Sequence, residues 1–226
     1  MKREEKNQLT RRKIMDSALA EFSEKGYGAS SINTVCAGQG ISKGIIYHYF
    51  ETKNELFLAC VEECFQRLTD YLRQNLEKTA SLQEAQLGSA ATEMTPGFTR
   101  LEMGLEHYFT ARQTFFQENP VYRRIFCEAV VNPPVNLQKE IQERKAEFDS
   151  LNTKILEDLL EPAPLRTGIT REEVVDTFRQ FQDFVNANYR MPKNGAEEFE
   201  QRELSCRKAM NILLYGVLER SEEYHA

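Results

Sequence analysis

One short stretch, residues 42–50, gathers side chains that can hydrogen-bond to an anionic or polar partner. Lys43 offers an ammonium group, and His48 adds an imidazole. Tyr47 and Tyr49 combine aromatic rings with hydroxyl groups. Side chains of these types contact phosphate oxygens and the edges of bases. The stretch therefore has the composition of a short recognition helix.

Two short helices joined by a glycine-broken turn are the elements that would position these side chains. Ser42 can accept the first free amide hydrogens of a helix, and Ile41 and Ile46 are spaced to face a core. Residues 30–37 predict an earlier short helix with a hydroxyl start, and residues 38–40, Gly-Gln-Gly, connect the two. Two helices joined in this way predict a helix-turn-helix, whose second helix lies in the major groove of DNA. An ordinary helical hairpin is the alternative.

A specific motif extends this pattern. Ser-Lys-Gly at residues 42–44 is followed by Tyr-x-Tyr-Phe at residues 47–50 and by Lys53. With these residues, the segment from about 10 to 56 resembles the DNA-binding domain of the tetracycline-repressor (TetR) family of transcriptional regulators. The chain departs from the family pattern at residues 38–39, where two alanines are usual, and at Glu21, which replaces a common apolar residue. The other matching positions are Ile14, Ala18, Phe22, Gly26, Tyr27, Ser31, Ile32, Val35, Ile41 and Leu56.

The resemblance implies a DNA-binding surface. The hydroxyls of Ser31 and Tyr47 can bond phosphate oxygens, and the missing side chain at Gly44 permits close approach. Lys43 can reach guanine, and Ile45 can touch a thymine methyl group. The full predicted set is Ser31, Ser42, Lys43, Gly44, Ile45, Tyr47, His48, Tyr49 and Lys53.

Two residues of this set depend on their neighbours. Residues 52–55 fit a capping box, so a longer helix begins at Thr52. Lys53 stands in the first turn of that helix, where we expect its ammonium to join free amides around a phosphate. For His48, a contact to a base or phosphate and a plain surface position both remain open.

Composition predicts an all-α protein. The 226 residues are 41% hydrophobic and 28% charged, with only 7 prolines, which is ordinary for a globular chain rich in helix formers. We expect about nine helices: a three-helix helix-turn-helix DNA-binding domain at residues 1–53, and a larger ligand-binding and dimerisation domain at residues 54–226. Five cysteines without metal-ligand spacing predict reduced thiols. No apolar run reaches the length of a signal peptide or membrane span, so we expect a cytoplasmic protein without membrane contact.

Charge is unevenly distributed along the chain. The net charge is −6, yet residues 1–60 hold nine Lys or Arg against seven Asp or Glu, whereas the remainder holds 20 against 28. Phosphate contacts and a solvated cluster are both open interpretations of the basic start of the chain. That cluster consists of Lys2, Arg3, Lys6, Arg11, Arg12 and Lys13.

Besides the two short helices of the helix-turn-helix, helical periodicity predicts seven more helices along the chain. They lie at residues 9–25, 52–78, 98–119, 121–131, 135–160, 170–189 and 199–220. Residues 79–97 are expected to form a loop with one short helix at residues 82–87. The aromatic region between residues 98 and 131 is a candidate small-molecule pocket, although aromatic stripes are more often core. The candidate lining residues are Leu105, His107, Tyr108, Phe109, Arg112, Phe116, Tyr122 and Phe126.

The last helix is apolar on two faces, which one domain cannot easily bury alone. Two helices from each of two subunits would make a four-helix interface, which is also how the resembling family forms dimers. A larger monomeric core is the alternative. The predicted interface residues are Phe178, Phe181, Val185, Ile212, Leu213, Gly216 and Val217.

These observations favour a ligand-responsive transcriptional repressor that binds a palindromic operator as a homodimer and is released by a small-molecule inducer. No phosphate loop, nucleophile elbow or metal-spaced cluster is present in the sequence, so we expect no enzymatic activity, no cofactor and no bound metal. Two alternatives remain open: a protein-interaction adaptor whose helix-turn-helix is structural, and an α-helical enzyme that uses the aromatic pocket.

Overall fold

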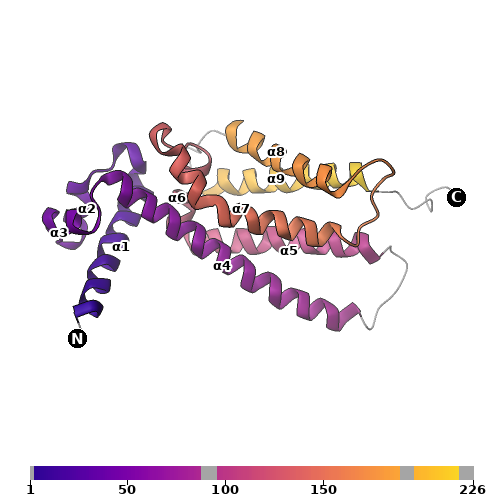
Figure 1. Cartoon of the computed structure of the whole chain (residues 1–226), viewed down its shortest axis with the longest axis horizontal. Coiled ribbons are helices and arrows are strands. Elements are labelled where there is room, and N and C mark those ends of the chain that lie inside the picture. The colour runs from indigo at the N-terminus through magenta and orange to yellow at the C-terminus, as the bar shows by residue number, and fades with distance from the viewer. Residues whose placement is uncertain (1–2, 88–95, 189–195, 219–226) are drawn as a thin grey trace. The chain divides into compact units, whose positions relative to one another are not determined.

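The computed structural model describes residues 3–87, 96–188 and 196–218 of the chain. In that part the protein forms nine α-helices and one short 3-10 helix (Figure 1). The fold is all-α and begins with a helix-turn-helix, as predicted. In chain order the elements are α1 (Arg3–Ala29), α2 (Ile32–Gln39), α3 (Lys43–Tyr49), α4 (Lys53–Leu87), α5 (Pro96–Glu118), α6 (Pro120–Val130), the 3-10 helix η1 (Val135–Leu137), α7 (Gln138–Leu160), α8 (Arg171–Asn188) and α9 (Ala196–Val217).

Caps and glycines set the ends of the first helices. Gly26 has φ of +75° and interrupts α1 near its end, a conformation that disfavours any residue with a Cβ. The Ser31 hydroxyl accepts a hydrogen bond from the Thr34 amide at the start of α2, and Gly40, with φ of +62°, ends that helix. Ser42 caps α3 in the same way as Ser31 caps α2. Local sequence signals therefore determine where these helices begin and end.

Capping boxes are present at the start of α4, as predicted, and at the start of α8. At the start of α4 the Glu55 amide donates to Thr52 Oγ1 at 3.1 Å, while the Glu55 carboxylate accepts from the Glu51 amide at 2.7 Å. At the start of α8 the Glu173 amide donates to Thr170 Oγ1 at 3.2 Å, and the Thr170 amide returns a bond to the Glu173 carboxylate at 2.8 Å. Each pair satisfies backbone amides that have no partner inside the helix.

Two boundaries differ from the sequence prediction. α1 begins at Arg3, earlier than the predicted start at residue 9. α4 continues without interruption to Leu87, so the expected loop with a separate helix at residues 82–87 is wrong for that stretch. Residues 79–87 hold no glycine or proline, and helix formers of this kind extend an existing helix readily. Residues 88–95 of the predicted loop lie outside the described part, and its last two residues begin α5.

The chain divides into two compact units. The first consists of Met1–Arg67 and Phe116–Glu147, and the second of Leu68–Phe115 and Phe148–Ala226. The unit that holds the helix-turn-helix therefore also contains α6. The predicted domain boundary after residue 53 stays a prediction.

In the first unit, α1 packs against α4 and α6. The rings of Phe22 and Phe57 lie 5.1 Å apart in an edge-to-face arrangement that aromatic pairs favour. From α6, Arg124 Nε donates to the Ser23 carbonyl oxygen at 3.1 Å. These contacts fix α1 within the first unit.

The second unit has its own apolar core, built from α5, α7, α8 and α9. Leu101, Leu160 and Leu214 are among its buried residues. After α9, Leu218 forms an isolated antiparallel bridge with Leu165, in the segment between α7 and α8. Among the residues that the structure describes, none of the helices is long and apolar enough to cross a membrane.

Candidate nucleic-acid interface

Helix α3 is anchored by a few apolar side chains and leaves its polar face open. Ile46 is fully buried, and Phe50, directly after the helix, is 3% exposed. On the other side, Ile45 is 42% exposed and Tyr47 is 45% exposed. Six of the nine predicted DNA-binding residues are exposed on this helix or its cap: Ser42, Lys43, Gly44, Ile45, Tyr47 and His48.

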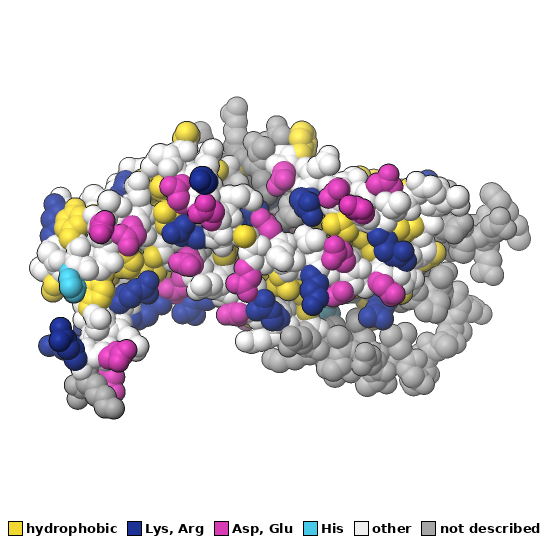
Figure 2. Space-filling view, in the orientation of Figure 1, with side chains coloured by type: hydrophobic (Ala, Val, Ile, Leu, Met, Phe, Trp, Pro, Cys, Tyr) yellow, Lys and Arg dark blue, Asp and Glu magenta, His cyan; other side chains and the backbone are white. Residues whose placement is uncertain are grey.

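The end of the first unit that carries α3 has a mixed surface. Figure 2 shows histidine and hydrophobic side chains at the surface there, close to Lys and Arg side chains. Tyr49 is half-buried, and its hydroxyl donates to the side-chain oxygen of Asn7 on α1. Its ring lies 5.3 Å from that of His48. Tyr49 therefore joins α3 to the amino-terminal part of α1.

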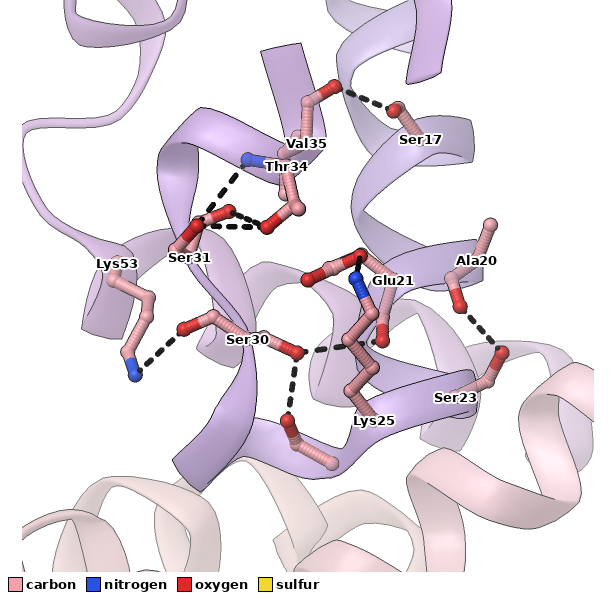
Figure 3. A network of polar contacts seen from close by, with 11 residues as sticks. Ser17, Ala20, Glu21, Ser23, Lys25, Ser30, Ser31, Thr34, Val35 and Lys53 are labelled. Atoms are coloured by element: carbon pink, nitrogen blue, oxygen red, sulfur yellow. Dashed lines mark hydrogen bonds and ion pairs between the residues drawn. The ribbon is translucent and has the colours of Figure 1, made fainter. Parts of the chain in front are cut away.

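The structure places Lys53 differently from the prediction. Its ammonium donates to the backbone oxygen of Tyr27 at 2.9 Å. It donates to the backbone oxygen of Ser30 as well, at 3.2 Å, a contact shown in Figure 3. It also lies 4.2 Å from the centroid of the Tyr27 ring, within the range of a cation–π contact. The expected geometry, with the ammonium among the free amides of α4, is therefore replaced by contacts to carbonyls between α1 and α2. Contact with DNA by Lys53 stays a prediction.

The hydroxyl of Ser31 is also engaged within the protein. It accepts from the Thr34 amide at 3.2 Å and lies 2.7 Å from the Thr34 hydroxyl. Figure 3 shows these contacts at the first turn of α2. Ser31 thus fixes the start of α2, which supports α3.

The two departures from the family pattern have local explanations. Ser17 donates to the Val35 backbone oxygen at 2.7 Å, and a Cβ added at Gly38 would lie 2.7 Å from the Ser17 hydroxyl. A serine on α1 thus occupies the space that an alanine methyl group at residue 38 would need. The Glu21 side chain is largely buried and pairs with Lys25 at 2.9 Å. At both positions a polar side chain of α1 therefore makes the local contact.

A charged network centres on Glu63 of α4. One oxygen of its carboxylate accepts from Arg12 of α1 at 2.8 Å, from the Tyr122 hydroxyl of α6 at 2.6 Å and from Arg67 at 3.0 Å. Burial raises the pKa of Glu63, but the hydrogen bonds from Tyr122 and Arg12 outweigh it and leave the pKa below its ordinary value. The carboxylate is therefore charged at neutral pH and joins three helices of the first unit.

Comparison with known proteins agrees with this geometry. Residues 14–60, from the core of α1 to the first turns of α4, match the family described as "Bacterial regulatory proteins, tetR family". This segment is similar to the amino-terminal domain of the TetR family. A stretch of 70 residues is 33% identical to the biofilm operon icaADBC HTH-type negative transcriptional regulator IcaR of Staphylococcus epidermidis, and covers 31% of this chain and 38% of that relative. The match thus spans well under half of the relative's length.

Solved structures share the fold over most of the chain. A TetR transcription regulator from Haloarcula marismortui has a TM-score of 0.62 at 16% identity, covering 94% of this chain and 100% of that chain. The fatty acid degradation regulator FadR from Bacillus halodurans has a TM-score of 0.61 at 17% identity, covering 92% and 100%. FadR from Bacillus subtilis, in complex with stearoyl-CoA, has a TM-score of 0.59 at 14% identity, covering 91% and 98%. At these identities the likeness establishes the fold alone.

The eight predicted pocket residues divide between the two units. Tyr122, Phe116 and Phe126 belong to the first unit. There the Phe116 and Phe126 rings pack 5.0 Å apart, and Tyr122 is bonded to Glu63. These three side chains therefore act as core and network residues of that unit. The other five are Leu105, His107, Tyr108, Phe109 and Arg112.

In the second unit, the polar members of that set already have partners. The Arg112 guanidinium is buried beside the Glu203 carboxylate at 3.2 Å, and the Tyr108 hydroxyl donates to Asn152 at 2.9 Å. Burial lowers the pKa of Arg112, but Glu203 and Tyr108 together outweigh it and raise the pKa above its ordinary value, so the guanidinium stays charged. His107 is exposed, whereas Leu105 and Phe109 are buried. A ligand pocket lined by these residues stays a prediction.

The predicted dimer face is only partly exposed. Phe178 is 5% exposed and belongs to the core of the second unit, and Leu213 and Val217 pack against the same core. The periodicity did not distinguish the inner face from the outer, so these three side chains contribute to the core of their own unit, and their contact with a second copy stays a prediction. Ile212 is 71% exposed and Gly216 is exposed. Phe181 is half-buried, and the side chain of Val185 lies outside the described part.

Sequence reasoning missed two large apolar side chains near that face. Phe184 of α8 is 64% exposed and Tyr215 of α9 is 54% exposed. The signal was present, because an aromatic residue outside the buried stripe of an amphipathic helix indicates a second contact surface.

Proposed function

We propose that this protein is a DNA-binding transcriptional regulator that reads duplex DNA with α3. The observation that carries the proposal is the arrangement of this helix: Ile46 anchors it, while Lys43, Ile45, Tyr47 and His48 face outward. A short helix with an exposed cation, an exposed aliphatic residue and hydroxyl donors matches what the major groove offers.

The finer proposal is repression by a homodimer at a palindromic operator, with release by a small-molecule inducer bound in the larger helical domain. The name of IcaR as a negative regulator supports repression. The FadR structure in complex with stearoyl-CoA supports ligand binding by the larger helical domain. The exposed apolar side chains of Ile212, Phe184 and Tyr215 support association of two copies through α8 and α9.

Two substitutions on α3 test the proposal with different readouts. Tyr47→Ala removes a phosphate contact, so it lowers affinity by about fivefold on every DNA sequence, as expected for a bond of ~1 kcal/mol. Lys43→Ala removes a base contact, so it also relaxes sequence preference. Affinity is measured by fluorescence anisotropy with two kinds of DNA duplex. One carries the sequence that flanks the protein's own gene, and the other is selected from a random pool.

Lys139→Ala is the matched control, because Lys139 is an exposed lysine on α7 of the same unit. Circular dichroism verifies that each variant is folded. If both α3 variants bind DNA as the unsubstituted protein does, α3 is not the reading helix, and the adaptor hypothesis gains support.

A further inference from the structure

The first turns of α1 stand apart from the core. Residues 3–9 are all exposed, and the first buried residue of the helix is Ile14. At 1.5 Å per residue, the segment from Arg3 to Ile14 is roughly 16 Å long. Figure 1 shows this segment extending beyond α2 and α3 within the first unit. The segment continues a helix whose later turns are packed, and it makes few tertiary contacts of its own.

One of these contacts joins the segment to α3, because the Tyr49 hydroxyl donates to Asn7. A second hydrogen bond lies within α1, where Thr10 Oγ1 donates to the Lys6 carbonyl oxygen at 2.9 Å. Between the two helices lies an open groove with a volume of about 940 Å³. Arg3, Glu4 and Lys6 are among the residues of its α1 wall, and Gly44 and His48 belong to its α3 wall.

The groove is continuous with the reading helix. Gly44, Ile45 and His48 line the groove and also belong to the proposed DNA-binding set. A duplex that receives α3 in its major groove therefore brings one of its strands alongside this second wall. The α1 wall holds two cations, Arg3 and Lys6, against one carboxylate, Glu4, and so favours an anionic occupant.

We propose that the groove between α1 and α3 holds a sugar–phosphate strand that flanks the base pairs read by α3, with Arg3 and Lys6 contacting its phosphates. This rests on the proposed function. Such contacts add affinity without sequence preference and extend the DNA site beyond the reading helix. The Glu4 carboxylate opposes the phosphates, so it limits the affinity of the groove.

Charge substitutions in the full-length protein test the groove. The double variant Arg3→Ala/Lys6→Ala removes two phosphate contacts, so the slope of log affinity against log salt falls in magnitude by about 1.8. Glu4→Gln tightens binding by roughly two- to fivefold, the scale of one exposed charge pair. Hydroxyl-radical footprinting of the double variant loses protection on the flanking strand and keeps it where α3 binds. Lys139→Ala, outside the groove, leaves its slope and footprint unchanged.

The outcomes separate the two proposals. A double variant with the unsubstituted protein's salt slope and footprint overturns the groove proposal, and weaker DNA binding by Tyr47→Ala in the same assay leaves recognition by α3 standing. Weaker binding by Glu4→Gln also counts against a phosphate strand in the groove, because it assigns the carboxylate to an attractive contact. If the unsubstituted protein binds no DNA, both proposals fail.

Discussion

Lys53→Met separates a structural role for the Lys53 ammonium from a role in DNA contact. Methionine keeps the length of the side chain and removes its charge. The ammonium donates to two backbone oxygens, those of Tyr27 and Ser30, and lies over the Tyr27 ring. These oxygens belong to the end of α1 and the connection to α2, where helical carbonyls lack internal partners.

The expected cost of the substitution is about 1–2 kcal/mol. A fully buried hydrogen bond to a charged group contributes roughly 1.5–3 kcal/mol, and a cation–π contact at an exposed site about 0.5–1 kcal/mol. Lys53 is only half-buried, so water replaces part of both contributions. For a chain of this size, such a loss lowers the melting temperature by roughly 2–8 °C.

Thermal unfolding followed by circular dichroism measures this effect, with Lys139→Met as the control for loss of a lysine from an exposed helical site. The control is expected to stay within about ±0.5 kcal/mol of the unsubstituted protein. The salt slope of DNA binding is measured on the same preparations. An unchanged melting temperature together with a slope reduced by about 0.9 would refute the structural assignment, because it is the result expected of a phosphate contact alone.

Three further predictions concern the helix ends, the Glu63 network and the dimer. Gly26→Ala should lower the free energy of unfolding by about 2–3 kcal/mol in urea titrations, because the φ of +75° disfavours alanine and its Cβ would lie 2.9 Å from a Glu128 oxygen. The folded-state pKa of Glu63 lies below its ordinary value. The charged carboxylate therefore contributes fully to stability above about pH 4.3, and that contribution is lost as the pH falls through the folded-state pKa. The free energy of unfolding of Glu63→Gln should decline less between pH 5 and pH 3 than that of the unsubstituted protein; an equal decline would contradict the assignment. Ile212→Glu should halve the molar mass in light scattering, whereas Lys208→Ala, an exposed position on the same helix, should leave it unchanged; equal masses would contradict association through α9.

Local signals were sufficient to predict the helix-turn-helix. Ser31, Ser42 and Thr52 each supply a hydroxyl within three residues of the amide that it accepts from. Gly26 and Gly40 adopt positive φ at the places where helices end or bend. Capping and turn geometry involve only neighbouring residues, so the printed sequence contains the information.

Longer-range partners were outside the reach of pattern reasoning. The oxygens that hold the Lys53 ammonium lie 23 and 26 residues earlier in the chain. Glu63 accepts a hydrogen bond from Tyr122, which lies 59 residues later in the chain. Periodicity identifies the apolar stripe of each helix, but it does not say which neighbouring helix that stripe meets.

By itself, the sequence determined the helical class, the short reading helix and its caps, because propensity, capping and 3.6-residue periodicity depend on nearby residues. Tertiary structure decided that Phe178 belongs to a core, that Lys53 holds backbone carbonyls, and that the first turns of α1 form a groove with α3. Each of these depends on which distant surfaces meet. Which side chains are buried, and which polar groups find hydrogen-bond partners, is determined only when the helices pack together.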